Sequence, residues 1–291
     1  MIKSSLKHET FTFPAGEMHV RLKVEDERSP SVNVTWEFKK SEDIVELLLY
    51  CNALKEAGYV LSTLEIPYFP FSRQDRVAVP GECFSLRVMC DLVNSLKAER
   101  VIIYDPHSHV LPALLDNVSV VSQASIFAAS VRELKFKAQD GGRSAVLIAP
   151  DAGALKKTYE LAACAGGLDV VTAFKHRDPK TGDITNTEIV AKPNELDGKT
   201  CIIVDDICDG GRTFVEIAKV LRRDHLPQRV ILMVTHGLFT KGFGVFDGLI
   251  DEFYTRAGKV SFMTTTPITN MTPSHPKRAQ AIKEIMERRA V

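Results

Sequence analysis

Short apolar runs that end in polar clusters recur along the chain. The clearest of them cover Val60–Ile66, Arg100–Tyr104, Ala145–Ala149 and Lys199–Val204. Each is followed at once by an acid or a proline, as in AVLIA followed by PDAG. Continuous apolar runs of this length, bounded in this way, are typical of strands buried on both faces of a parallel sheet.

Amphipathic segments lie between these runs. The segment SEDIVELLLYCNALKEAG predicts a helix, with Ser41 as its N-cap and Gly58 just past its end. Strands that alternate with helices predict an open α/β fold of doubly wound domains with mainly parallel sheets. Ligands of such sheets bind beyond the carboxyl ends of the strands, so we expect the polar clusters to form one site.

A polar, glycine-containing stretch, Lys135–Ser144, separates two sets of strand and helix patterns. It predicts an N-terminal α/β domain over residues 1–138 and a C-terminal α/β domain over residues 139–291. The segment Ser274–Ala290 predicts a basic amphipathic helix, and the N-terminal domain is one surface on which it could pack.

Composition narrows the class of protein. Lys and Arg total 37 and Asp and Glu total 37, which argues against a general nucleic-acid binder. The start of the chain has no signal-peptide pattern, and no apolar stretch is long enough to span a bilayer. Six scattered cysteines contain no CxxC pair. We therefore expect a reduced, cytoplasmic protein that acts on small molecules, without nucleic-acid or membrane partners.

The strongest chemical motif covers Ile202–Phe214, where a strand, two acids, two glycines and a helix follow one another. Small residues let a phosphate approach the backbone amides, and a helix N-terminus adds partial positive charge. Carboxylates suit sugar hydroxyls instead. The motif predicts a ribose-phosphate site made of Asp205, Asp206, Asp209, Gly210, Gly211, Arg212 and Thr213. The alternative is a structural strand-to-helix turn with Asp209 as its N-cap.

VDDICDGGRT resembles the phosphoribosyl-binding signature of phosphoribosyltransferases and of ribose-phosphate diphosphokinases, the PRPP synthetases. Further segments resemble the latter family in the family's order: FPAGEMHVRL, IPYFPFSRQDR, YDPHSH, IAPDAGALKK and VTHGLFTKG. Together they extend from about Phe11 to about Gly242. Simple transferases share only the ribose-phosphate signature, so the joint match favours the synthetases.

The resemblance implies two phosphoribosyltransferase-like domains and transfer of the β,γ-diphosphate of Mg-ATP to ribose 5-phosphate. It implies Mg²⁺ held by His107 and Asp151, and a catalytic loop that begins at Lys175 and Arg177. It also implies a homo-oligomer, whose ATP site is completed by the Phe13–Glu17 loop of a neighbouring subunit. The ATP-binding residues that it implies are Phe13, Gly16, Glu17, Arg73, Gln74 and His107.

Departures from the family pattern leave the acceptor open. Ala15 replaces a usual acid or amide, and VAVPGEC lacks the usual basic residues. Arg212 stands where a glycine is usual, and its planar fork can grip a phosphate. One hypothesis is therefore that the acceptor is ADP-ribose, in a pathway of NAD salvage. The other is that ribose 5-phosphate binds as usual while Arg212 faces solvent.

Two other classes of function compete with a diphosphokinase. A phosphoribosyltransferase would share the ribose-phosphate loop but would not need the RQD, DPH and KxR segments. A non-catalytic regulatory relative could bind nucleotides on the same fold. The presence of Lys175, Arg177, His107 and Asp151 argues against this second class, because such a relative could lose them freely.

Overall fold

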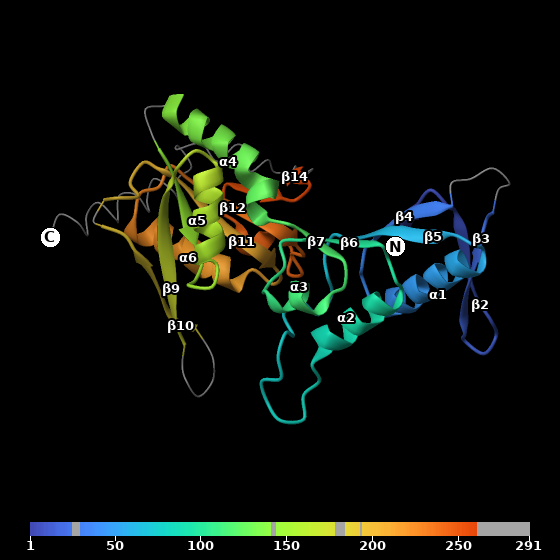
Figure 1. Cartoon of the computed structure of the whole chain (residues 1–291). Helices are drawn as coiled ribbons and strands as arrows, with labels where there is room; N and C mark the ends of the chain where they lie inside the picture. Colours follow the sequence, from blue (N-terminus) through green and yellow to red (C-terminus); the bar gives the residue numbers. More distant parts are fainter. Residues whose placement is uncertain (25–29, 141–143, 178–183, 193, 261–291) are drawn as a thin grey trace. The chain divides into compact units, whose positions relative to one another are not determined.

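The computed structural model describes residues 1–24, 30–140, 144–177, 184–192 and 194–260 (Figure 1). The chain divides into two compact units, an N-terminal unit, Met1–Ser122, and a C-terminal unit, Gln123–Val291. This division lies before helix α4 (Gln123–Asp140), whereas the sequence suggested one near the end of that helix. The polar stretch from Lys135 onward, which suggested a linker, begins inside the helix. The helix predicted over residues 274–290 lies outside the described residues.

The N-terminal unit contains a five-stranded sheet with the order β1-β4-β5-β6-β7. Strands β4 to β7 are parallel, and β1 pairs with β4 in the antiparallel sense at the edge. A separate hairpin of β2 and β3 belongs to the same unit. The strands are β1 (Ile2–Ser4), β2 (His8–Thr12), β3 (Met18–Leu22), β4 (Ser31–Trp36), β5 (Val60–Ile66), β6 (Arg100–Tyr104) and β7 (Val118–Val121). The helices are α1 (Glu42–Glu56), α2 (Ser85–Ser95) and α3 (Val110–Leu114).

The core of this unit lies on one face of the sheet. Alternate residues of β4, Val32, Val34 and Trp36, are buried and share one cluster with Leu47 of α1 and Met89 of α2. Figure 1 shows α1, α2 and α3 along the same side of the strands. The residues between the buried ones are polar or half-exposed, which gives these strands the period of two that is expected where one face is buried.

The ends of α1 show which part of its prediction was correct. Gly58 follows the helix with a φ of +79°, a conformation that favours glycine and ends the helix as predicted. Ser41 is the N-cap residue, as predicted, but its side chain makes no capping hydrogen bond. Instead, the Asp43 carboxylate accepts hydrogen bonds from the backbone N–H groups of Lys39 (2.7 Å) and Lys40 (3.0 Å). The capping bonds therefore reach backwards from the first turn of the helix.

The C-terminal unit contains a seven-stranded sheet with the order β10-β9-β8-β11-β12-β13-β14. Strands β9, β8, β11, β12 and β13 are parallel, and β10 and β14 are antiparallel to their neighbours. The strands are β8 (Ala145–Ala149), β9 (Asp169–Arg177), β10 (Ile184–Val190), β11 (Thr200–Cys208), β12 (Arg229–Gly237), β13 (Glu252–Thr255) and β14 (Gly258–Lys259). The helices are α4, α5 (Leu155–Cys164), α6 (Arg212–Asp224) and a short 3-10 turn, η1 (Gly244–Phe246).

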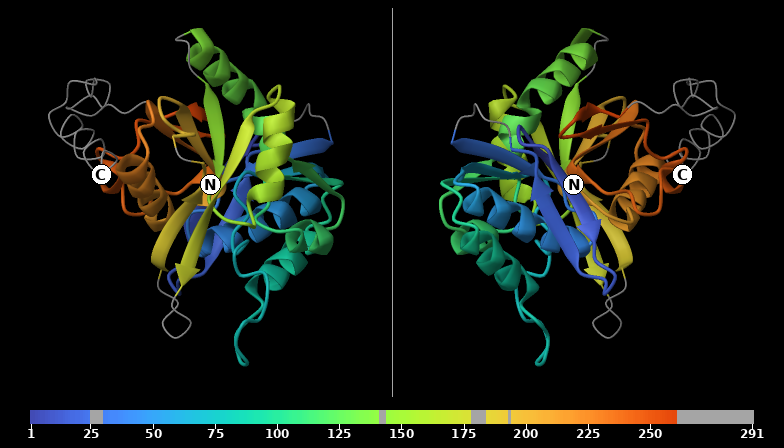
Figure 2. Two further views of the ribbon diagram at one scale, coloured as in Figure 1. Left: turned by 90° about the vertical axis from the view of Figure 1, so that its left-hand side faces the viewer. Right: turned by 90° about the vertical axis from the view of Figure 1, so that its right-hand side faces the viewer.

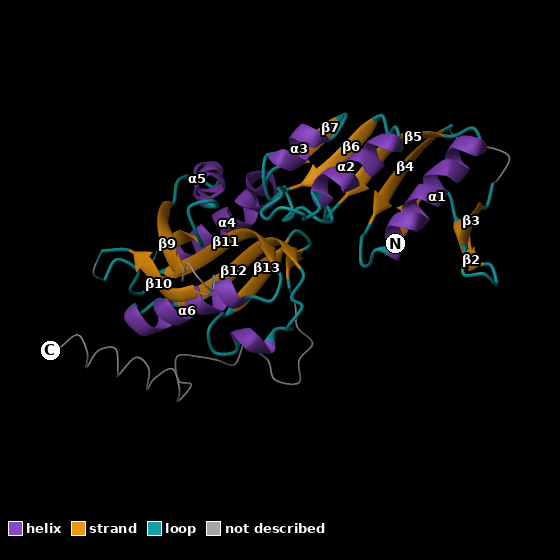
Figure 3. Ribbon diagram, turned by 90° about the horizontal axis from the view of Figure 1, so that it is seen from below, coloured by secondary structure: helices purple, strands orange, loops and turns teal. Residues whose placement is uncertain are grey.

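Helices cover both faces of this second sheet. Ile203 and Leu232 point into a cluster with Ile217 of α6, whereas Ile202 and Ile231 point into a different cluster with α4 and α5. Figure 3 shows α6 on the opposite side of the strands from α4 and α5. The α/β fold with mainly parallel sheets is thus as predicted. None of the helices in the described ranges is long and apolar enough to cross a membrane.

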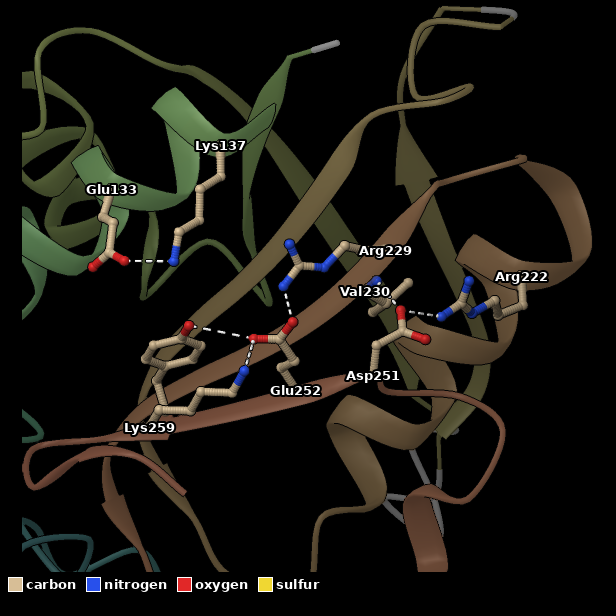
Figure 4. A network of polar contacts seen from close by, with 9 residues as sticks. Glu133, Lys137, Arg222, Arg229, Val230, Asp251, Glu252 and Lys259 are labelled. Carbon is tan, nitrogen blue, oxygen red and sulfur yellow. Dashed lines mark hydrogen bonds and ion pairs between the residues drawn. The ribbon is translucent and has the colours of Figure 1, made fainter. Parts of the chain in front are cut away.

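Ion pairs connect the start of β13 to α6, β12 and β14 (Figure 4). Asp251 accepts hydrogen bonds from the Arg222 guanidinium of α6 and from the Val230 N–H of β12, both at 2.6 Å. Glu252 pairs with Arg229 and, at 2.8 Å, with Lys259. These contacts hold α6, β12 and β13 together. The loops of the candidate site leave from the other ends of the strands, the carboxyl ends of β11 and β12.

Candidate active site

The predicted site residues of the C-terminal unit gather at one edge of its sheet. Asp151 follows β8, and Asp205 and Asp206 lie near the end of β11. Lys175 and Arg177 lie in the last part of β9. Because β8, β9 and β11 are parallel neighbours, their carboxyl ends meet at the same edge.

The predicted ribose-phosphate loop connects β11 to α6. The strand continues to Cys208, four residues beyond the predicted end at Val204, because it stays paired with β12 as far as Gly237. Asp205 and Asp206 are therefore strand residues, and the turn itself is only Asp209, Gly210 and Gly211.

Gly211 shapes this turn. Its φ is +80°, and a Cβ at this position would collide with the ring of Phe246, which is itself buried. Only glycine meets both conditions without strain. Gly211 is also the N-cap residue of α6, a role that the structural alternative had given to Asp209. The Asp209 carboxylate instead accepts a hydrogen bond from the Thr240 hydroxyl at 2.7 Å.

The paired acids place negative charge at the end of a buried strand. Burial raises the pKa of Asp205 well above its usual value, and the negative charge of Asp206 and, more weakly, that of Asp151 raise it further. A hydrogen bond from the Asp206 N–H to Asp205 Oδ1, at 2.9 Å, acts in the opposite direction. The edge is therefore an environment in which a cation or hydroxyl donors would be stabilised.

Asp151 lies in the turn between β8 and α5. Its Oδ1 accepts a hydrogen bond from the Ala154 N–H at 3.1 Å, which fixes the carboxylate over the start of the helix. A Cβ at Gly153 would lie 3.3 Å from the same oxygen, so the small residue leaves room for this geometry. No group of three or more His, Cys, Asp and Glu side chains forms a metal centre within the described ranges. Mg²⁺ usually takes one or two protein carboxylates and keeps several waters, so the Asp151 carboxylate is the kind of ligand that this ion would use.

Lys175 and Arg177 occupy a strand, although the sequence suggested the start of a loop. Strand β9 pairs with β8 as far as Thr172 and then continues with β10 as its antiparallel partner. In this register Lys175 is opposite Thr187 and Arg177 is opposite Ile184. Figure 2 shows the two strands extending together as a hairpin. Residues 178–183, within the predicted catalytic loop, lie outside the described residues.

The predicted ATP-binding residues belong to the N-terminal unit. Phe13, Gly16 and Glu17 form the tip of the β2–β3 hairpin, where the Gly16 N–H donates to the Phe13 carbonyl at 2.8 Å. Gly16 has a φ of +91°, which explains the glycine of this motif. Phe13 is 47% exposed, and its ring lies against those of Phe11 and His19.

The other predicted ATP-binding residues follow neighbouring parallel strands. Arg73 and Gln74 are exposed in the connection from β5 to α2, where the Gln74 N–H donates to the Phe71 carbonyl at 2.8 Å. His107 is exposed in the turn after β6, next to the buried Asp105. Since β5 and β6 are adjacent, both connections leave the same edge of this sheet.

One cation beside the predicted ribose-phosphate loop was not among the residues predicted from the sequence. Lys241 lies in the turn after β12, and a Cβ added at Gly210 of the loop would be 3.6 Å from its Cδ and Cε. The segment VTHGLFTKG was part of the family pattern, but no binding or catalytic role was predicted for a residue in it. Gly210 and Lys241 are 31 positions apart, so no local pattern could reveal their proximity.

Two family models match the chain. The N-terminal domain of ribose phosphate pyrophosphokinase matches residues 3–96, and the phosphoribosyl transferase domain matches residues 118–251. A ribose-phosphate pyrophosphokinase of Thermococcus kodakarensis is 33% identical over 240 residues, which cover 81% of this chain and 80% of the relative. The chain belongs to the ribose-phosphate pyrophosphokinase family. It is therefore an enzyme of the transferase class, as predicted.

Other ribose-phosphate pyrophosphokinases agree with this assignment. The one from Pyrococcus abyssi is 31% identical, over 79% of this chain and 76% of the relative. Among solved structures, the phosphoribosylpyrophosphate synthetase from Mycobacterium smegmatis superimposes with a TM-score of 0.70. The superposition covers 86% of this chain and 80% of the synthetase chain. Because the two sequences are only 23% identical, this likeness supports the fold alone.

Proposed function

We propose that this enzyme transfers the β,γ-diphosphate of Mg-ATP to the anomeric hydroxyl of ribose 5-phosphate. The products are phosphoribosyl pyrophosphate and AMP. The observation that carries the proposal is the β11–α6 connection, where the half-buried Asp205 and the buried Asp206 are followed closely by a glycine-lined helix N-terminus. Relatives that carry the name ribose-phosphate pyrophosphokinase support the same class of reaction.

The loop offers different chemistry to the two ends of the acceptor. Asp205 and Asp206 can accept hydrogen bonds from vicinal ribose hydroxyls, which stabilises their negative charges. The backbone N–H groups from Asp209 to Thr213 would hold the 5′-phosphate at the N-terminus of α6. Such binding leaves the anomeric hydroxyl as the reactive end of the sugar.

The N-terminal unit would bind ATP. The exposed ring of Phe13 can stack on an aromatic base, and the turn closed by Gly16 keeps it at the hairpin tip. Glu17, Arg73, Gln74 and His107 are all exposed and can contribute polar contacts. We infer that the hairpin serves a neighbouring subunit of a homo-oligomer, as the family resemblance implies.

Asp151 would hold Mg²⁺, and His107 would contact ATP. The hard carboxylate oxygen of Asp151 suits this ion, whereas an imidazole nitrogen suits it poorly. When bound, Mg²⁺ would neutralise the charge on the phosphate oxygens of the donor. The neighbouring charges of Asp205 and Asp206 favour a cation at this edge of the sheet.

Lys175 and Arg177 would be the catalytic residues. In the reaction, the anomeric oxygen forms a bond to the β-phosphorus while the bond from this phosphorus to the α,β-bridging oxygen breaks. AMP leaves, and the hydroxyl proton is released. Phosphoryl transfer requires mainly positioning and neutralisation of charge on the moving group, which a lysine and an arginine can supply.

A product assay tests the proposal. The protein is incubated with Mg-ATP and ribose 5-phosphate, and products are identified by mass spectrometry. We expect AMP and phosphoribosyl pyrophosphate in equal amounts, with a loss of about 10²- to 10³-fold in kcat for Lys175→Ala. Lys137→Ala, on an exposed face of α4, is the matched control and should keep wild-type activity. ADP as the product, or no turnover by the wild type, would contradict the proposal.

ADP-ribose is a second candidate acceptor because of Arg212. This residue is the first of α6, and its side chain is exposed beside the loop that would bind phosphate. A guanidinium can bind two phosphate oxygens at once, which suits an acceptor with a diphosphate. Replacing ribose 5-phosphate by ADP-ribose in the same assay compares the two acceptors directly.

A further inference from the structure

The turn after β12 is fixed against the ribose-phosphate loop. The Leu238 and Phe239 N–H groups donate to the Cys208 carbonyl, at 2.9 and 3.1 Å. Thr240 donates twice to Asp209, from its N–H to the carbonyl (3.1 Å) and from its hydroxyl to the carboxylate (2.7 Å). These hydrogen bonds hold the two segments in one arrangement.

The turn is also rigid in itself. The Gly242 N–H donates to the Phe239 carbonyl at 2.8 Å, which closes a four-residue turn with Thr240 and Lys241 at its centre. The ring of Phe239 packs on that of Phe243, with 4.4 Å between their centroids. The backbone of Lys241 therefore has a defined position beside the loop.

The side chain of Lys241 extends along Gly210. A Cβ at Gly210 would lie 3.6 Å from both Cδ and Cε of Lys241, an ordinary van der Waals distance. The stem of this side chain thus lies beside the glycine, and Lys241 is exposed to solvent, as is usual for a long basic side chain. In the part of the chain that the structure describes, no carboxylate forms an ion pair with this ammonium.

The charge of the ribose-phosphate loop indicates a role for the Lys241 ammonium. The loop from residue 205 to residue 213 carries the acids Asp205, Asp206 and Asp209 and one cation, Arg212. Asp206 and Asp209 outnumber that cation even without the charge of Asp205, whose pKa is raised. A phosphate dianion must approach this acidic segment. Backbone N–H groups attract it with partial charges only, so a full positive charge beside the loop would offset the repulsion.

We propose that Lys241 is a binding residue for the acceptor, and that its ammonium pairs with the 5′-phosphate held by the β11–α6 loop. The proposal rests on the proposed function, because it takes this loop as the acceptor's phosphate site. It assigns a specificity-determining contact to the turn after β12. The chemical group recognised is a phosphate monoester on a pentose.

Calorimetric titration of the full chain without ATP tests this contact. Lys241→Met keeps the methylene stem and removes the charge, and we expect the Kd for ribose 5-phosphate to rise about tenfold. The Kd for inorganic phosphate should rise in the same way. Lys241→Arg should restore affinity. Lys219→Met is the matched control, because Lys219 is exposed on α6 and pairs with Glu216 at 2.9 Å.

Steady-state kinetics separate a binding role from a structural one. Lys241→Met should raise KM for ribose 5-phosphate and leave KM for ATP and the melting temperature unchanged. Wild-type affinity in both Lys241→Met and Lys241→Gln would overturn the proposal, even with normal AMP formation. A wild type that binds ribose 5-phosphate but forms no AMP would overturn the proposed function alone. The two failures are therefore distinguishable.

Discussion

The two sheets of this protein bury their strands differently. All five residues of β8 are buried, and β11 is buried along almost its whole length, because helices lie on both faces. In the N-terminal sheet, β4 and β6 alternate between buried and more exposed positions. One sheet therefore has the pattern of a fully enclosed parallel sheet, and the other that of a sheet with one packed face.

This difference extends to the candidate site. The acids of the C-terminal unit lie on or beside the ends of enclosed strands, where burial raises the pKa of Asp205. The predicted ATP-binding residues of the N-terminal unit are exposed on turns. We infer that the predicted residues fall into two halves: an enclosed half in the C-terminal unit, fixed by the core of that unit, and an exposed half in the N-terminal unit, made of surface side chains. Substitutions of buried groups in the enclosed half should therefore change stability, and those in the exposed half should change substrate binding alone.

Substitutions at two adjacent glycines, Gly210 and Gly211, should show the largest difference in stability within the enclosed half. Gly211→Ala should destabilise the C-terminal unit by about 2–4 kcal/mol, since it adds a strained φ and a collision with Phe246. Gly210→Ala should change stability by less than about 0.5 kcal/mol, because its Cβ would make an ordinary contact with Lys241. Differential scanning calorimetry measures both.

A second substitution tests the cause of the first effect. Phe246→Leu shortens the side chain that faces Gly211, so the double variant should lose less stability than the sum of the single changes. Equal destabilisation by Gly210→Ala and Gly211→Ala would show that the loop is not shaped by this contact.

A substitution of Asp205, also in the enclosed half, should change both the stability of the protein and the binding of ribose 5-phosphate. Its raised pKa means that the folded protein binds this proton more tightly than the unfolded chain does. Stability therefore falls as the pH rises from about 3.8, the ordinary value, through the folded pKa. Without Mg²⁺, Asp205→Asn should stabilise the protein at pH 7 and have little effect near pH 3.

The same variant should bind ribose 5-phosphate about tenfold more weakly, because it loses a charged acceptor for a sugar hydroxyl. Urea unfolding across this pH range, together with calorimetric titration, measures both effects. Asp169→Asn, at an exposed carboxylate at the start of β9, is the control and should change neither. Destabilisation of Asp205→Asn at pH 7 would contradict the electrostatic account.

Much of the fold follows from the sequence because it depends on local patterns. The runs at Val60–Ile66, Arg100–Tyr104 and Ala145–Ala149 form strands with these bounds. The glycine after α1 also has the predicted role. Periodicity and glycine conformation act within a few residues, so they can be read without tertiary structure.

The remaining features depend on contacts between distant segments. Strand β11 extends past Val204 through Asp205 and Asp206 because β12 pairs with it, and β9 reaches Lys175 and Arg177 because β10 pairs with it. The position of Lys241 beside Gly210 also depends on tertiary structure. The sequence predicted the acids and glycines of the site, but the strand ends and the second cation depend on tertiary pairing.

Phe13 tests the exposed half. Phe13→Ala should raise KM for ATP about tenfold, because stacking of an aromatic ring on a base is worth roughly 1–3 kcal/mol. It should leave the melting temperature unchanged, since the ring is 47% exposed. Phe136→Ala is the control, because that phenylalanine is 58% exposed on α4. A loss of stability in Phe13→Ala would mean that the hairpin tip is part of the core.

Substitution of Arg212 has the smallest expected effect on stability, and it is the sharpest test of the comparison between the enclosed and the exposed halves. It lies in the enclosed half, yet its side chain is exposed at the first residue of α6. Because this side chain is exposed, Arg212→Gly should change the stability of the C-terminal unit by no more than about 1 kcal/mol, which is the intrinsic cost of a glycine in a helix. This is less than the cost expected for Gly211→Ala, one residue earlier.

The same variant decides what Arg212 recognises. With ribose 5-phosphate as the acceptor, we expect kcat/KM to fall only a few-fold, since the loop amides and Lys241 would still hold the phosphate. The fall should be equal for ADP-ribose, measured by AMP release under the same conditions. A loss confined to ADP-ribose would instead assign Arg212 to a second phosphate. In that case an exposed side chain would set the acceptor, while the buried acids would serve the ribose common to both acceptors.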